Sequence, residues 1–221
     1  MRIGVNRFTW DMRHPGATTF NGLIMWSAGT NGPLALPGTY QVRLTVDDKP
    51  PQTQSFEIGK SARLANVSLE ELRAQFELAT RVRDRTSEAN EAVIAIRDVK
   101  TQVDDRIGKD GSIRLQGDGL KIKFTDVEGE IYQYRNQSSQ DPLNFPIKLN
   151  NKIAALMGAV EGVDGRPTRQ SYEVFDYLSA QLDQQMGRLD VLIRTDLEEF
   201  NRLLQSKGLD PIKAQPRKPV A

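Results

Sequence analysis

The sequence contains no cysteine and only one histidine, His14. Without cysteine the chain forms no disulfide bond, no thiolate metal site and no cysteine nucleophile. A Ser-His-Asp triad would have to use His14, which lies in a His-Pro-Gly turn, and no G-x-S-x-G run supplies a nucleophile. No Glu-x-x-His pair is present for a di-iron helical bundle. We therefore expect no enzyme activity, no cofactor and no metal site.

The chain also lacks an excess of one charge and any long apolar run. Lys and Arg total 30 against 29 Asp and Glu, a formal net charge of +1, which gives no field to attract nucleic acid or an anionic membrane. No run of about 18 apolar residues is present to span a bilayer, and the start MRIGVNRFTW has no apolar signal-peptide core. We expect no nucleic-acid partner, no membrane insertion and, for the chain as written, a cytoplasmic location.

Residues 1–60 have the texture of β-structure. Short runs rich in Val, Thr and aromatic residues are separated by Gly and Pro, and polar and apolar residues alternate over 7–12, 39–46 and 53–58, which predicts strands there. We expect a partial immunoglobulin-like β-sandwich in which the last two strands form a hairpin. Three aromatic residues are interpreted as its core rather than as a carbohydrate platform: Trp10, Trp26 and Tyr40.

Residues 66–208 have a helical pattern. Ser68 with Glu71 three residues later forms a capping-box signature, and apolar spacing continues to Gly108. Further helices are expected over 120–134, 147–160 and 168–207. The last of these carries apolar residues at steps of three, four and four, an eleven-residue repeat close to the natural period of an α-helix.

Such an apolar stripe is stable only when other helices cover it. The pattern therefore predicts an antiparallel four-helix bundle after the sandwich, an α+β chain in two parts. Residues 209–221 contain three prolines and three basic residues, and we expect them to form a disordered tail.

The loop that leads into the helix predicted over 147–160 is the one candidate binding site. It combines amide, carboxylate and aromatic side chains in Asp141, Asn144, Phe145, Asn150 and Asn151. Such a loop could contact a ligand or partner. Its asparagines could equally satisfy buried backbone groups and cap helix ends, and we favour this structural interpretation.

Two motifs carry a resemblance to a known module. N-x-x-x-W-D-x-R over residues 6–13 is followed by P-G-x-Y-x-V-x-L over residues 37–44. In this order they resemble the immunoglobulin-like module of the flagellar hook-capping protein. That module has further strands before the first motif, whereas five residues precede it here, so the resemblance implies an incomplete sandwich. Another chain could supply the missing strands.

A second resemblance covers the helical part. The run D-P-L-N-F-P-I-x-L-N-N over residues 141–151, with residues 167–175 downstream, is similar to the C-terminal region of bacterial sortilin-like (VPS10-type) BNR-repeat propeller proteins. These secreted or periplasmic proteins are often labelled glycosyl hydrolase. In that family the propeller, where a sialidase-like site would lie, precedes the immunoglobulin-like module and the helices.

The resemblance implies a non-catalytic accessory or scaffold module that positions its propeller or binds another protein chain. A different interpretation is a stand-alone helical adaptor or chaperone-like protein that recruits its partner through an apolar face of the bundle. The third is a fragment of a glycoside hydrolase whose catalytic propeller is absent.

Overall fold

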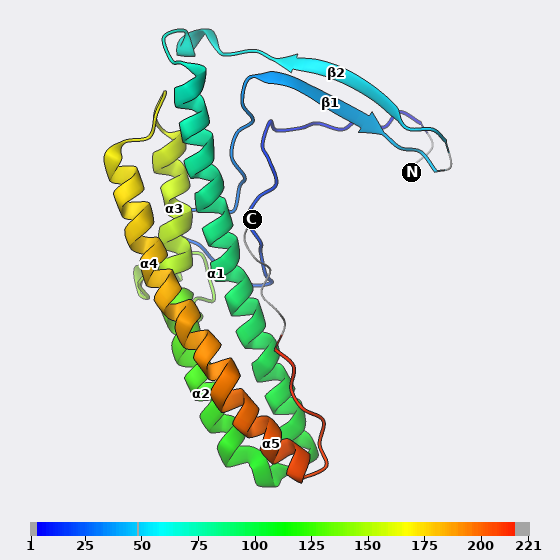
Figure 1. Ribbon diagram of the computed structural model, residues 1–221, viewed down its shortest axis with the longest axis vertical. Coiled ribbons are helices and arrows are strands. Elements are labelled where there is room, and N and C mark those ends of the chain that lie inside the picture. Colours follow the sequence, from blue (N-terminus) through cyan, green and yellow to red (C-terminus); the bar gives the residue numbers. More distant parts are fainter. Residues whose placement is uncertain (1–3, 48, 215–221) are drawn as a thin grey trace.

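The computed structural model describes residues 4–47 and 49–214 of the chain. A two-stranded sheet, β1 (Gly38–Leu44) and β2 (Gln52–Ile58), precedes five α-helices (Figure 1). The helices are α1 (Leu69–Lys109), α2 (Arg114–Ile131), α3 (Leu149–Glu161), α4 (Arg169–Leu192) and α5 (Glu198–Ser206). Short 3-10 turns lie at Ala62–Leu64, Gly111–Ile113 and Asp141–Leu143, and a π-helical segment lies at Ile193–Leu197.

The four predicted helical regions are all present, but they form three columns. α1 runs the full length of the bundle, while α2 and α3 lie one above the other beside it (Figure 1). α2 and α3 run antiparallel to α1, since Lys121 bonds Asp104 near one end and Gln75 bonds the Val160 carbonyl near the other. α4 continues through the π-helical segment into α5 and forms the third column.

The two long columns begin as the sequence predicts. Ser68 caps α1 by accepting a hydrogen bond from the Glu71 backbone N–H, and the Glu71 carboxylate accepts one from the Ser68 N–H in return. These bonds hold the pKa of Glu71 below its ordinary value. Thr168 caps α4 through a bond from the Ser171 N–H. Both caps satisfy backbone donors that a helix leaves unpaired at its start.

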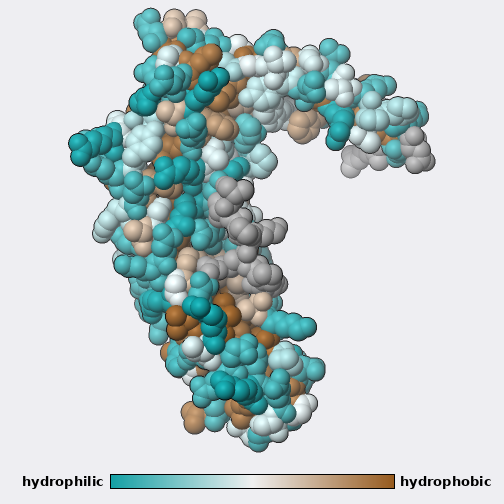
Figure 2. All heavy atoms as spheres, in the orientation of Figure 1, coloured by the Kyte–Doolittle hydropathy of each residue, from teal (hydrophilic) through white to brown (hydrophobic). Residues whose placement is uncertain are grey.

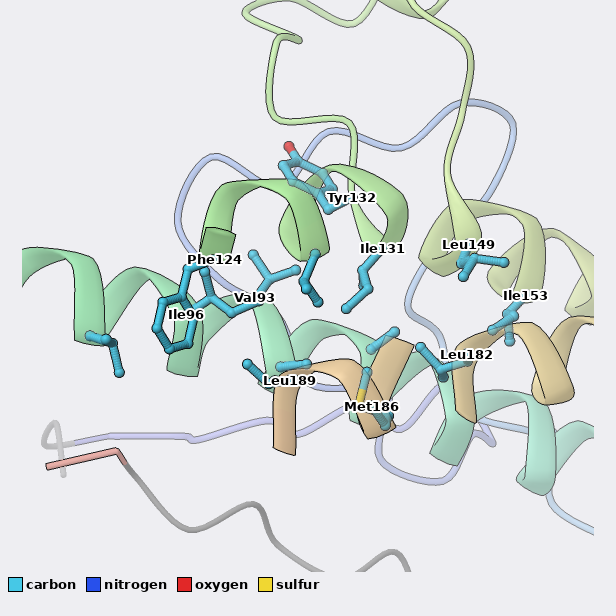
Figure 3. Close-up of a cluster of buried hydrophobic side chains, with 14 of the residues drawn as sticks. Val93, Ile96, Phe124, Ile131, Tyr132, Leu149, Ile153, Leu182, Met186 and Leu189 are labelled. Atoms are coloured by element: carbon cyan, nitrogen blue, oxygen red, sulfur yellow. The ribbon is translucent and has the colours of Figure 1, made fainter. Parts of the chain in front are cut away.

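The apolar stripe predicted over 168–207 is covered by the other columns. Its buried members on α4 and beyond are Phe175, Leu178, Leu182, Met186, Leu189, Leu197, Phe200 and Leu204. They meet side chains from α1, α2 and α3 in one continuous core, part of which Figure 3 shows around Phe124, Ile153 and Leu182. The bundle therefore buries its own stripe, and the core runs along its whole length.

The predicted β-sandwich is wrong. In the described residues the only sheet is the β1–β2 hairpin, which is antiparallel with Tyr40 opposite Phe56 and Leu44 opposite Gln52. Residues 7–11 are extended but form no ladder, Met12 has a φ of 60°, and Arg13 and Leu34 make a single isolated bridge. A sandwich needs a second sheet to cover the inner face of the first, and the described residues contain no second sheet.

Residues 13–36, which lie between the predicted strands 7–12 and 39–46, cross the helices as a strap (Figure 1). The Thr18 N–H bonds the Ser87 hydroxyl on α1, and the Thr18 carbonyl accepts from Asn90. Trp26, expected in the sandwich core, is bound through its backbone to Asn151 on α3. The first sixty residues are thus divided between the bundle surface and a projecting arm, defined as residues 4–12 with β1 and β2.

The start of the predicted tail is packed against the bundle. Ile212 is buried, and Asn201 on α5 bonds both its N–H and its carbonyl. Gln102 on α1 makes the same pair of bonds with the backbone of Lys213. Residues 209–214 are therefore an ordered end of the bundle, while residues 215–221 lie outside the described residues. Within the described ranges, no helix has both the length and the apolar character needed to cross a bilayer.

Candidate interaction site

The predicted loop does not form one site, because its asparagines turn into the bundle. Asn151 is buried and binds the Trp26 backbone twice: its Oδ1 accepts from the Trp26 N–H at 2.6 Å, and its Nδ2 donates to the Trp26 carbonyl at 2.9 Å. Asn150 is also buried and donates to the Asn90 Oδ1 at 3.1 Å. Both amides satisfy buried polar groups, which is the structural role favoured from the sequence.

The other three members of the loop face elsewhere. Asp141 accepts hydrogen bonds from the backbone N–H groups of Gln137 and Ser138, which hold the pKa of its carboxyl below the ordinary value. It therefore stabilises its own turn. Asn144 is exposed and Phe145 is half-buried. The loop offers these two side chains, but no converging set of polar groups, to a ligand.

The asparagine contacts belong to a larger set that fixes the strap on the helices. The Tyr132 hydroxyl donates to the Gly22 carbonyl at 3.0 Å and accepts from the Ile24 N–H at 3.2 Å. The Phe20 ring packs edge-on against the Tyr132 ring, and the Arg97 guanidinium lies 4.8 Å from the Phe20 centroid. Arg97 also pairs with the buried Glu128, which is held by Lys100 as well. The polar groups of this region are paired within the chain.

The two ends of the strap, near Arg13 and Leu34, fix the base of the arm. Arg13 Nη1 lies 2.9 Å from Glu161 Oε2 at the end of α3, and donates to the Gly32 carbonyl at 2.7 Å. Glu161 also accepts from the Leu34 N–H at 3.0 Å. The His14 ring packs edge-on against Phe76 of α1. The Glu161 carboxylate thus binds both ends of the strap and joins the base of the arm to the bundle.

Beyond this base the arm projects sideways from the bundle, as Figure 2 shows. Residues 4–12 return along β1 from the tip to the base (Figure 1). Near the base Trp10 closes over the hairpin, with its ring 5.6 Å from Tyr40 and 6.3 Å from Phe56. The Trp10 indole N–H donates to the Arg13 carbonyl, and the Tyr40 hydroxyl donates to the Leu36 carbonyl. This aromatic cluster is the only part of the arm that resembles the expected sandwich core.

Toward the tip the same face is uncovered. Val42 is 51% exposed, Leu44 49% and Phe8 84%. The residues alternate as in a half-buried strand, so the apolar side chains Tyr40, Val42 and Leu44 share one face. A groove of about 860 Å³ opens along it, with Phe8 and Trp10 on one side and Val42 and Phe56 on the other. This uncovered apolar face is the candidate interaction site.

Sequence reasoning predicted the apolar faces of these strands but placed them inside a sandwich. Alternation shows which side chains share a face, and it does not show whether a second layer covers them. The resemblance to a module with further strands before residues 6–13 implied an incomplete sandwich, and this was the available signal that the face could be uncovered. Phe8, Val42 and Leu44 were therefore not identified as site residues.

No cluster of three or more His, Asp or Glu side chains suited to a metal ion lies within residues 4–47 and 49–214. The acidic groups of the arm are engaged locally: Glu57 accepts from the Thr39 hydroxyl, and Asp11 accepts from the Arg13 N–H. Comparison of the chain with family models, curated proteins and solved structures finds no match to any of them. The arm's geometry is thus the basis for a functional hypothesis.

Proposed function

We propose that this chain is a non-catalytic accessory module that binds another polypeptide through its arm. The observation that carries the proposal is the contrast between a closed helical core and an arm whose apolar face is half covered. The bundle buries its stripe, whereas Phe8, Val42 and Leu44 remain between about half and mostly exposed. Contiguous exposed apolar surface of this kind marks interaction sites in stable proteins.

The resemblance to sortilin-like propeller proteins supplies the expected partner. In that family a propeller and further immunoglobulin-like strands precede the motif at residues 6–13. A partner of this kind would cover the uncovered apolar face of the arm. The helical columns would serve as the scaffold from which the arm projects. The adaptor interpretation through a bundle face has less support, because α4 and α5 already pack against the other columns.

Binding to a purified propeller fragment tests this proposal. The probe is the propeller with its adjoining immunoglobulin-like strands, taken from a sortilin-like protein and lacking its own helical region. We expect a one-to-one complex in sedimentation velocity, and we expect Val42→Glu to weaken it at least about tenfold, because a buried carboxylate in an apolar contact carries a desolvation cost.

The matched control is Leu115→Glu. Leu115 is 82% exposed on α2, so the same substitution adds the same charge to an apolar surface position outside the arm. Equal weakening by both substitutions, or no complex at all, would contradict binding through the arm. Turnover of sialosides or aryl glycosides by the isolated chain, lost on replacing one carboxylate, would contradict the non-catalytic role.

A further inference from the structure

The backbone of the arm has unused pairing capacity beside its apolar face. Residues 7–11 are extended, and in the described part of the chain their N–H and C=O groups make no backbone hydrogen bond. Both outer edges of the hairpin are also unpaired within the described residues. Extended backbone with free donors and acceptors is a template for adding a strand. The arm therefore offers main-chain pairing and an apolar face together.

The charges along the arm indicate what the added strand carries. The Trp10–Tyr40 contact sets residues 4–12 antiparallel to β1. Arg7 lies three residues before Trp10, and Arg43 lies three residues after Tyr40. Arg7 precedes Phe8 in the extended segment and Arg43 follows Val42 on β1, and both side chains are exposed.

Within the described residues, neither guanidinium makes an ion pair or a side-chain hydrogen bond, whereas Asp11 and Glu57 are already engaged. A carboxylate placed beside either guanidinium would form a charge-assisted hydrogen bond with it. An acidic group is thus the complement of the polar side of the arm.

We infer that the arm binds an extended segment of a partner polypeptide by strand addition along residues 7–11, with apolar side chains at alternate positions and a carboxylate beside Arg7 or Arg43. Its apolar side chains lie against Phe8, Val42 and Leu44. Its carboxylate lies on the opposite face. The inference rests on the proposed function and names the chemistry of the segment that the arm recognises.

Short synthetic peptides test this inference directly. The probes are nine-residue peptides that alternate Val and Thr, with the central Thr replaced by Glu, Lys or Gln. Trp10 reports binding by fluorescence in a Trp26→Phe background, since the chain has two tryptophans. We expect the Glu peptide to bind on the order of tenfold more tightly than the Lys peptide, because it gains a favourable cross-strand charge pair where the Lys peptide meets a repulsive one. N-methylation of alternate peptide amides should abolish binding.

A charge reversal in the protein supplies the second arm of the test. Arg7→Glu with Arg43→Glu should reverse the preference, so that the Lys peptide binds more tightly than the Glu peptide. The matched control is Arg73→Glu with Lys152→Glu, which makes the same change of net charge at two exposed positions on the bundle. This control should leave the Glu peptide preferred.

Several results would overturn the inference. These are no saturable change in Trp10 fluorescence with any peptide, a preference that the arm reversal leaves unchanged, and a reversal by the bundle control. Sedimentation showing that the arm instead pairs with a second copy, with Val42→Glu dissociating the dimer, would also overturn it. If the propeller fragment binds through the arm while the peptides do not, the strand inference fails and the proposed function stands.

Discussion

At the scale of single residues, asparagine decides how the N-terminal part attaches to the helices. Asn90 and Asn150 are buried and bond to each other, and Asn90 also bonds the Thr18 carbonyl. Asn151 pairs with both backbone groups of Trp26. A side-chain amide can donate and accept at once, so it can replace the neighbouring strand that an extended segment otherwise needs.

Replacing Asn151 by Ala should therefore destabilise the protein. The substitution leaves the Trp26 N–H and carbonyl without their partners, and we expect a loss of about 1 to 3 kcal/mol in the free energy of unfolding. Urea denaturation followed by circular dichroism measures this loss. Hydrogen exchange should also become faster at the Trp26 amide.

The control comes from the same loop. Asn144 is exposed, so Asn144→Ala should change stability by less than about 0.5 kcal/mol. If both alanine variants have equal stability, the pairing of Asn151 with the strap contributes nothing. In that case the strap would be held by its other contacts alone.

At the scale of elements, the glycines of α2 have different roles. A Cβ added at Gly117 would lie 2.7 Å from Ile107 Cδ1 and 3.1 Å from Val103 Cγ1, whereas one at Gly119 would meet nothing within 4 Å. Gly117 thus allows α2 to approach α1 closely. The sequence prediction started this helix at Leu120, where the apolar spacing begins, but α2 begins at Arg114 because tertiary packing outweighs the weak helix propensity of Gly117 and Gly119.

Alanine substitutions at the two positions should have opposite effects. Gly119→Ala should raise the free energy of unfolding by about 0.5 to 1 kcal/mol, because alanine restricts the unfolded chain and favours helix. Gly117→Ala should lower it, since overpacking costs about 1 to 3 kcal/mol against the same propensity gain. Urea denaturation of the two variants compares them directly, and equal stabilisation of both would contradict a close approach at Gly117.

At the scale of the whole molecule, a small set of contacts sets the direction of the arm. Glu161 binds Arg13 and the Leu34 N–H, and so attaches both ends of the strap to the end of α3. The bundle core does not depend on these bonds. The arm can therefore be loosened without unfolding the helices.

Glu161→Ala should widen the range of arm orientations. Because the chain has no cysteine, spin labels at Ser55→Cys on the arm and Gln116→Cys on the bundle give one distance by pulsed electron resonance. We expect a broader distance distribution with little change in helical content. Glu173→Ala removes an exposed ion pair with Arg169 within α4 and should leave the distribution unchanged. An equally narrow distribution in the Glu161 variant would show that other contacts orient the arm.

The sequence by itself determined the helices, their caps and the β1–β2 hairpin. These features depend on local periodicity and on side chains within a few residues, such as Ser68 with Glu71. The apolar repeat after Thr168 likewise identified the buried side chains of α4 and α5. Local patterns also indicated the structural role of Asn150 and Asn151, although not their partners.

Only the tertiary structure decided the three-column arrangement, the strap and the uncovered arm. Alternation over residues 7–12 predicts a strand wherever a partner strand is available, but it cannot show whether the partner is there. Residues 13–36 bond to α1, α2 and α3 instead of forming sheet, because side chains distant in sequence, such as Asn90 and Asn151, satisfy their backbone groups. The face that the sequence placed inside a sandwich is for this reason the exposed surface on which the proposed function depends.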